Sequence, residues 1–404
     1  MTESLEFSLL VGAGLVLLSV LVSPLATRLG APILLVFLGI GMLVGQDGPG
    51  GFEFNDFELA YQVGSVALAV ILFAGGLGTS LKAIRVCWGP ALALATLGVV
   101  LTAAVVGASV WLYGIPLLVA LLLGSVIGST DAAATFLLLQ GRGIKLRGRV
   151  METIVVESGL NDPMAIFLTI VLVAFVDAGG GELSWGLAQT FGLQIGLGAV
   201  AGILGGLALA WLINRLDLES GLSAVMALAG AIALFGGTQL IGGSGYLAVF
   251  LCGVGLMHQV HGARRDELDM THASLAWLSQ ILMFLMLGLL VTPHELVGEA
   301  TSAAAVAFVL IFIARPLAVA ITLAPFNYRL RERVFIGWVG LRGAVPIFLA
   351  IIPVVSPGPV DVNFFNVVFM VVIASLVLQG WSIPWLARRL GLEVRTVDAT
   401  GTEP

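Results

Sequence analysis

Long apolar runs, separated by short polar stretches, repeat along the whole chain. A helix that crosses a bilayer needs about 20 mostly apolar residues, so each run of about that length predicts one membrane span. The pattern predicts an all-α polytopic membrane protein of about thirteen transmembrane helices, at residues 5–22, 31–45, 59–79, 88–112, 116–140, 152–176, 185–213, 220–241, 245–258, 274–291, 299–324, 334–355 and 364–386.

The charges between the spans indicate the direction of the chain. Cytoplasmic loops of membrane proteins carry an excess of Lys and Arg. Thirteen spans place 16 of the 18 Lys and Arg residues on one side, all but Arg315 and Arg342, and the loops of the other side carry acids such as Glu53 and Asp361. We therefore expect a cell inner membrane protein with its N-terminus outside and its C-terminus in the cytoplasm.

Composition excludes several functional classes. Hydrophobic residues make up 59% of the chain and charged residues 10%, against about 25% charged in soluble domains, so membrane lipid is the expected surrounding. No basic stripe for nucleic acid is present, and Cys87 and Cys252 stand alone in apolar stretches, which favours neither a disulfide framework nor a zinc site. Without a Ser/His pair or a His-Glu-x-x-His motif in the spans, we expect neither an enzyme nor a cofactor.

Two pairs of segments indicate an internal repeat. Residues 33–46 resemble residues 246–259, and residues 128–137 align with residues 340–349. Both pairings join spans that are seven apart, and an odd separation gives the copies opposite orientations in the membrane. This is the inverted repeat of secondary transporters. We expect one transmembrane domain over 1–404, with repeats of about 25–180 and 238–390 joined through the long span 185–213 and no cytoplasmic regulatory domain.

Glycine and polar residues interrupt the fifth and twelfth spans at corresponding places. Gly128, Ser129 and Thr130 precede Asp131 in one, and Arg342 lies among glycines in the other. In transporters with inverted repeats, helices break at the midplane next to the binding site. We expect two broken helices that cross near the bilayer centre, with Asp131 and Arg342 placed to offset the partial charges of the half-helix ends. Asp131 either caps a helix end or contacts an ion directly.

The sixth span carries the principal candidate chemistry. Ser158 and Asp162 are four residues apart and share one helix face, whereas Glu157 lies on a neighbouring face. Hard cations take oxygen ligands, which Asp162, the Ser158 hydroxyl and open carbonyls near Thr130 offer. Low dielectric disfavours the charged carboxylate, so Asp162 is expected to hold either a proton or a cation.

The remaining polar groups inside spans have structural alternatives. Arg342 is expected to neutralise Glu157, because an unpaired buried charge is costly. Arg315 is either a gating group near the cavity or a snorkelling or internally paired side chain. Gln280 either lines the cavity or makes a hydrogen bond between helices.

Three motifs carry a family resemblance: 157–167 (ESGLNDPMAIF), 128–134 (GSTDAAA) and 340–346 (GLRGAVP). With them, essentially the whole chain resembles the monovalent cation:proton antiporters of the NhaP type, in particular the potassium/proton branch that serves cell volume and pH homeostasis. The resemblance implies a homodimer in which an elevator-like core domain moves against a dimerisation domain.

The resemblance also implies roles for individual residues. It implies a cation at Asp162 assisted by Ser158, Thr130 and Asp131, with Asn161 holding the broken helix and Glu157 paired with Arg342. An Asn–Asp pair, here Asn161–Asp162, is associated in this family with electroneutral exchange of one cation for one proton. Many relatives carry an acid where this chain has Ala74, which puts the gating or pH-sensing role of that acid in doubt.

The function expected is exchange of a monovalent cation, K⁺ favoured, for H⁺, with both competing for Asp162. Na⁺/H⁺ exchange on the same fold is one alternative. A cation channel is an alternative from another class, which the inverted repeat, the titratable site and the lack of a carbonyl-ring filter sequence disfavour.

Overall fold

The computed structural model describes residues 5–29, 32–146, 148–179, 185–216, 218–219 and 221–393. Within these ranges the chain is helical and forms no β-strand beyond two isolated bridges. The helices are α1 (Leu5–Leu29), α2 (Ile33–Val44), α3 (Phe57–Gly78), α4 (Leu81–Ala93), α5 (Val99–Leu112), α6 (Leu117–Val126), α7 (Ala132–Gln140), α8 (Gly148–Asp177), α9 (Trp185–Arg215), α10 (Leu222–Leu240), α11 (Gly245–Gln259), α12 (Ala263–Leu289), α13 (Pro293–Phe308), α14 (Arg315–Thr322), α15 (Leu330–Trp338), α16 (Ala344–Val355) and α17 (Val362–Arg389).

The predicted passes can be counted on these helices. In the part of the chain that the structure describes, nine helical stretches are long and apolar enough to cross a membrane. Two of them contain a π-helical turn, η1 (Leu94–Gly98) between α4 and α5 and η2 (Val309–Ala314) between α13 and α14. The shorter apolar helices α2 and α11 and the pairs α6–α7 and α15–α16 supply four more passes. The expectation of about thirteen spans is confirmed.

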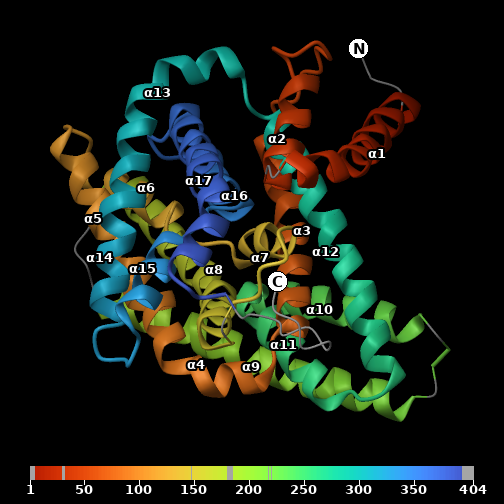
Figure 1. The fold of residues 1–404 in the computed structure, drawn as a ribbon. Coiled ribbons are helices and arrows are strands. Elements are labelled where there is room, and N and C mark those ends of the chain that lie inside the picture. Colours follow the sequence, from red (N-terminus) through yellow and green to blue (C-terminus); the bar gives the residue numbers. More distant parts are fainter. Residues whose placement is uncertain are drawn as a thin grey trace, which may run out of the picture.

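The helices form two bundles that lie side by side (Figure 1). The α3 bundle consists of α1–α3 and α9–α12, and the α8 bundle consists of α4–α8 and α13–α17. Most helix contacts stay inside one bundle, whereas the boundary is formed mainly by α3, α11 and α12 against α8 and α16. The loop between α12 and α13, residues 290–292, joins the two bundles directly.

Close packing inside the α3 bundle depends on small residues. Gly198, Gly202 and Gly206 of α9 face α11 and its N-cap residue, and a Cβ at these positions would lie 2.6–2.7 Å from backbone oxygens there. Small residues at such a spacing allow two membrane helices to approach closely. This contact helps make the α3 bundle a compact frame beside the α8 bundle.

The two interrupted helices cross as predicted. α6 ends at Val126 and α7 begins at Ala132, while α15 ends at Trp338 and α16 begins at Ala344. The backbone N–H of Asp131 donates a hydrogen bond of 2.8 Å to the carbonyl of Leu341. The two extended segments therefore touch, and four half-helix ends meet within the α8 bundle.

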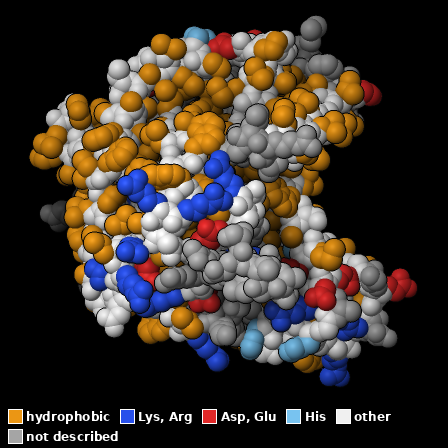
Figure 2. All heavy atoms as spheres, viewed as in Figure 1, with side chains coloured by type: hydrophobic (Ala, Val, Ile, Leu, Met, Phe, Trp, Pro, Cys, Tyr) orange, Lys and Arg blue, Asp and Glu red, His pale blue; other side chains and the backbone are white. Residues whose placement is uncertain are grey.

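Charged side chains are distributed unequally over the molecule. Figure 2 shows Lys and Arg side chains in the lower part and the middle of the visible face, and none at the upper end where α13 begins. Apolar side chains cover much of the visible face between this upper end and the Lys and Arg side chains. Arg147 and Arg395, which contributed to the predicted charge asymmetry, lie outside the described residues.

Candidate functional site

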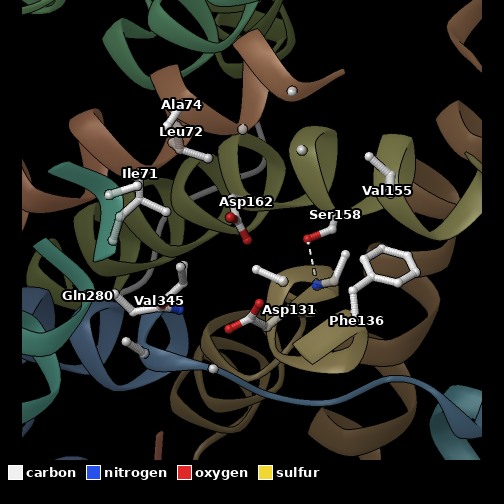
Figure 3. Close-up of a pocket in the computed structure, with 18 of the residues that line it drawn as sticks. Ile71, Leu72, Ala74, Asp131, Phe136, Val155, Ser158, Asp162, Gln280 and Val345 are labelled. Carbon is white, nitrogen blue, oxygen red and sulfur yellow. Dashed lines mark hydrogen bonds between the residues drawn. The ribbon is translucent and has the colours of Figure 1, made fainter. Parts of the chain in front are cut away.

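A cavity of about 540 Å³ lies between the two bundles. Its wall comes from α3, α11 and α12 on one side and from α7, α8 and α16 on the other. Figure 3 shows Asp131, Ser158 and Asp162 grouped on the α8-bundle side, with Gln280 across from them. The cavity collects these predicted residues together with Thr130.

Helix α8 places Asp162 and Ser158 on the cavity wall. The two residues are one helical turn apart, and Asp162 is 7% exposed. Pro163 follows directly inside the helix. Because proline has no backbone N–H, the carbonyl of Gly159 loses its helical partner, and Gly159 also lines the cavity. A carboxylate, a hydroxyl and an open carbonyl thus gather on one face of α8.

Side chains from α8 hold the extended segment between α6 and α7. The Ser158 hydroxyl donates to the carbonyl of Thr130 at 2.8 Å and accepts the backbone N–H of Ala132 at 3.1 Å, the contact drawn in Figure 3. The Asn161 amide donates to the Thr130 hydroxyl at 2.6 Å. Asn161 therefore contacts the broken helix as expected.

Ser129 is a site residue that the sequence reasoning missed. Its hydroxyl donates a short hydrogen bond to the carboxylate of Asp162, and the side chain is almost fully buried. The available signal was its place in the interrupted motif directly before Thr130 and Asp131. Which hydroxyl of that motif turns toward α8 depends on the path of an extended segment, which periodicity does not predict.

Asp131 caps the start of α7. Its carboxylate accepts the backbone N–H of Ala134 at 3.0 Å. The side chain also lies against Gly343, the residue directly before α16. Helix N-termini carry partial positive charge, so this carboxylate faces the starts of two half-helices and still lines the cavity.

Arg342 turns to the opposite ends of the half-helices. Its guanidinium Nη1 donates to the carbonyls of Gly128 at 2.7 Å and Ser129 at 2.5 Å, just beyond the C-terminus of α6. A cation is favourable there because helix C-termini carry partial negative charge. Asp131 and Arg342 were expected to offset the partial charges of the half-helix ends, and the structure places them at opposite kinds of end.

A polar chain from α17 braces the second break. The backbone N–H of Arg342 donates to the Ser375 hydroxyl at 3.1 Å, and that hydroxyl donates to Gln379 at 2.5 Å. The Gln379 amide in turn donates to the carbonyl of Trp338 at 2.7 Å. Sequence reasoning missed both side chains, although a polar pair four residues apart in an apolar span was the available signal.

The predicted pairing of Glu157 with Arg342 is wrong. Glu157 pairs with Arg315 at 2.6 Å, and both side chains are buried. Arg315 lies at the start of α14, outside the cavity wall, so its expected alternative as an internally paired side chain holds and its place near the cavity does not. Two buried arginines were available to one glutamate, and only the tertiary structure decides which one reaches it.

The chemistry of the cavity is that of oxygen donors. Among the described residues, no group of three or more His, Cys, Asp and Glu side chains could hold a metal ion. The cavity instead offers carboxylate, hydroxyl and carbonyl oxygens. Such ligands suit hard cations.

Comparison with known proteins places the chain among transporters. Residues 15–389 match the family model described as sodium/hydrogen exchanger, transmembrane. The chain is 47% identical to the K(+)/H(+) antiporter NhaP of Alkalimonas amylolytica over 396 residues, covering 97% of this chain and 68% of that protein. It is 45% identical over 395 residues, with the same coverage, to the K(+)/H(+) antiporter NhaP2 of Shewanella oneidensis.

A solved structure shares the fold. The sodium proton antiporter MjNhaP1 from Methanocaldococcus jannaschii at pH 8 matches with a TM-score of 0.84 and 22% identity, over 96% of this chain and 99% of that chain. At this identity the likeness concerns the fold and says nothing of the transported ion.

Proposed function

The chain belongs to the sodium/hydrogen exchanger family, and from this premise we propose that it is a secondary antiporter that exchanges a monovalent cation, K⁺ in preference, for H⁺. One observation carries the proposal: a buried carboxylate, Asp162, faces a cavity between two helix bundles and is surrounded by oxygen donors. Ionisable residues inside a membrane are functional sites by default. The relatives named K(+)/H(+) antiporters support the choice of K⁺.

Competition for one carboxylate couples the two ions. The charged carboxylate of Asp162 attracts a cation, and Ser158 and the carbonyls near Thr130 complete its oxygen shell. When Asp162 takes a proton its charge is lost and the cation has no counterion in a medium of low dielectric. The site therefore carries a proton in one direction and a cation in the other.

The stoichiometry follows from the number of free carboxylates. Asp131 is engaged as the cap of α7, and Glu157 is paired with Arg315. The neighbour of Asp162 is the neutral Asn161, and Ala74 on the α3 wall brings no charge. One carboxylate that alternates between one proton and one cation supports electroneutral 1:1 exchange.

Alternating access is proposed to arise from movement of the α8 bundle past the α3 bundle. The cavity extends from Asp162 to Thr79 and Gln140, near loops that carry Lys and Arg. Because basic loops lie in the cytoplasm, this side is assigned to the cytoplasm of an inner membrane, with the N-terminus outside and the C-terminus inside. Movement of the α8 bundle carries Asp162 toward the opposite side.

We further propose a homodimer embedded in lipid, on the strength of the NhaP-type resemblance. Apolar side chains of α9, such as Ile203, Leu204 and Trp211, are exposed on the α3 bundle. A second copy or lipid would cover them. Cysteine cross-linking between copies in native membranes tests this assembly. Native mass spectrometry that finds only monomers, in membranes containing the protein at its cellular level, would contradict it.

Na⁺/H⁺ exchange is the alternative that a specific observation favours. The Na(+)/H(+) antiporter NhaH of Halobacillus aidingensis is 30% identical over 322 residues, 74% of this chain and 75% of that protein. K⁺ and Na⁺ use the same oxygen ligands, so the distinction lies in the size of the occupied site. Direct comparison of the two ions decides it.

The deciding experiment reconstitutes the protein in liposomes with an internal pH dye. Pulses of K⁺, Na⁺ and Li⁺ should each be tested, and a K⁺ pulse is expected to drive proton movement that clamping the membrane potential leaves unchanged. Asp162→Asn should abolish exchange, because it removes the only charge on which both ions compete. Asp177→Asn, at the exposed end of the same helix, is the matched control. Exchange at the wild-type rate in Asp162→Asn, or cation flux without proton movement as in a channel, would overturn the proposal.

A further inference from the structure

Ser129 occupies a position at Asp162 that the ion-binding proposal does not use. Among the described residues it is the one whose side chain donates a hydrogen bond to the Asp162 carboxylate. Ser129 is 1% exposed and also lines the cavity. The contact joins the break between α6 and α7 directly to the carboxylate on α8.

The backbone around Ser129 is fixed by neighbouring contacts. Its own carbonyl accepts a hydrogen bond of 2.5 Å from Arg342. The next residue, Thr130, is held by Asn161 through its hydroxyl and by Ser158 through its carbonyl. The hydroxyl of Ser129 is therefore held toward Asp162 by contacts from the second break and from α8.

A hydroxyl can satisfy this carboxylate in each state of the proposed cycle. A serine hydroxyl has one donor and two acceptor positions and rotates freely. It donates to the charged carboxylate, it can accept the proton of the neutral carboxyl group, and its oxygen can face a bound cation. A side chain with only one of these capacities would leave a buried polar atom unpaired in one state, which is costly.

Few charged side chains line the cavity that could take the place of the hydrogen bond from Ser129 to Asp162. Besides Asp162, Asp131 is the only ionisable residue in the described cavity wall, and it caps the start of α7. The cavity-lining residues of α3, α8, α11, α12 and α16 otherwise bring no ionisable side chain. The nearby cation, Arg342, is directed to the carbonyls of the first break.

We propose that Ser129 is the positioning residue that sets the balance between proton and cation at Asp162, and that its hydroxyl oxygen joins the cation's ligands. The inference rests on the proposed cation/proton exchange at Asp162. It also gives Arg342 a role at a distance: by fixing the carbonyl of Ser129, Arg342 orients the hydroxyl that stabilises the charged carboxylate.

Ser129→Ala removes a hydrogen bond to the charged form and leaves the neutral form less affected. The proton is then held more tightly, so the pH of half-maximal exchange should rise by about one unit. At a fixed pH below that midpoint, the apparent KM for K⁺ should rise about tenfold, because cation and proton compete. The maximal rate at alkaline pH should be largely retained. If part of the variant protein were instead unfolded, this maximal rate would fall.

Two further variants control the experiment. Ser129→Thr keeps the hydroxyl and should restore the wild-type pH profile. Ser125→Ala removes a buried hydroxyl one turn earlier, which donates to the carbonyl of Leu121 at 2.9 Å within α6 and lies outside the cavity wall. It should leave the pH profile unchanged. An unshifted profile in Ser129→Ala, or a profile in Ser129→Thr shifted as far as that of Ser129→Ala, would overturn the proposal.

A spectroscopic measurement separates this inference from the proposed function. Infrared difference spectra of the purified protein between acid and alkaline pH should show a carboxyl band that Asp162→Asn removes. Its titration midpoint should move upward in Ser129→Ala, whether or not the protein exchanges ions. A wild-type protein without exchange would defeat the proposed function alone, whereas an unmoved midpoint in folded Ser129→Ala would defeat the role of Ser129.

Discussion

The two broken helices occupy corresponding places in the predicted repeats, yet their side chains do different things. In the break between α6 and α7, Ser129, Thr130 and Asp131 all line the cavity. In the break between α15 and α16, Arg342 lies outside the cavity wall and binds carbonyls of the first break. The same backbone irregularity thus lines the cavity in one copy and supports that lining in the other.

This difference has a physical basis in what each break must satisfy. The first break gives up carbonyls and hydroxyls that a cation can use. Arg342 donates hydrogen bonds to the carbonyls of Gly128 and Ser129 from outside the cavity wall. The remaining oxygen atoms of this break are therefore left on the cavity side. The second break is closed by Ser375 and Gln379 and has little left to offer an ion.

The largest expected effect tests which arginine belongs to Glu157. Glu157→Gln should lower the free energy of unfolding by roughly 3–5 kcal/mol, because it leaves the buried Arg315 without its ion partner. In a double-mutant cycle, Arg315→Met should recover much of that loss. Arg342→Met should not, because its partners are carbonyls of the first break. Unfolding in detergent followed by circular dichroism measures each term of the cycle. If the coupling energy of Glu157 with Arg342 were larger than that with Arg315, Arg342 would be the ion partner of Glu157. The two breaks would then not differ in this way.

A smaller effect is expected at the brace of the second break. Gln379→Leu should cost about 1–3 kcal/mol of stability, since the partly buried carbonyl of Trp338 and the buried Ser375 hydroxyl each lose a partner. The apparent KM for cations should stay close to the wild-type value, because Gln379 lies outside the cavity wall. Thermal unfolding and liposome exchange on the same preparation test both statements. A changed KM at wild-type stability would show that the second break also shapes the ion site.

The smallest effect is expected for Asp47, an exposed carboxylate that accepts a backbone N–H at a helix start, as Asp131 does in the buried break. Asp47 accepts the backbone N–H of His294 at 2.8 Å at the start of α13, as Asp131 accepts that of Ala134 in the buried break. This hydrogen bond, with the nearby His294 side chain, holds the pKa of Asp47 below its ordinary value of 3.8. A depressed pKa contributes stability above the unfolded value, and the contribution is lost as pH falls through the folded value.

Asp47→Asn should therefore lower Tm slightly at pH 5 and above, and the difference from wild type should vanish as the pH falls below 3.8. Glu53→Gln, in the same loop, is a control without this contact to α13. Melting curves across that range provide the measurement. A Tm loss as large as that of Gln379→Leu would contradict the view that burial, rather than the helix end itself, gives the cap at Asp131 its importance.

Patterns along the chain predicted most of the architecture. The thirteen passes, the breaks at Asp131 and Arg342, and the grouping of Ser158 with Asp162 follow from hydrophobic length, glycine position and helical spacing. Each rule is local, and in a membrane it is enforced strictly because unsatisfied backbone groups are costly in lipid. The boundaries of the two repeats, 25–180 and 238–390, remain predictions.

The sequence by itself determined that a carboxylate, Asp162, lies within a membrane span beside an interrupted helix, because span length and residue spacing are local properties. Only the tertiary structure decided that Glu157 pairs with Arg315, that Ser129 reaches Asp162, and that Ser375 and Gln379 close the second break. These partners are at least 33 residues apart along the chain and meet only in the folded bundle. There, side-chain direction and helix crossing, rather than residue type, select each partner.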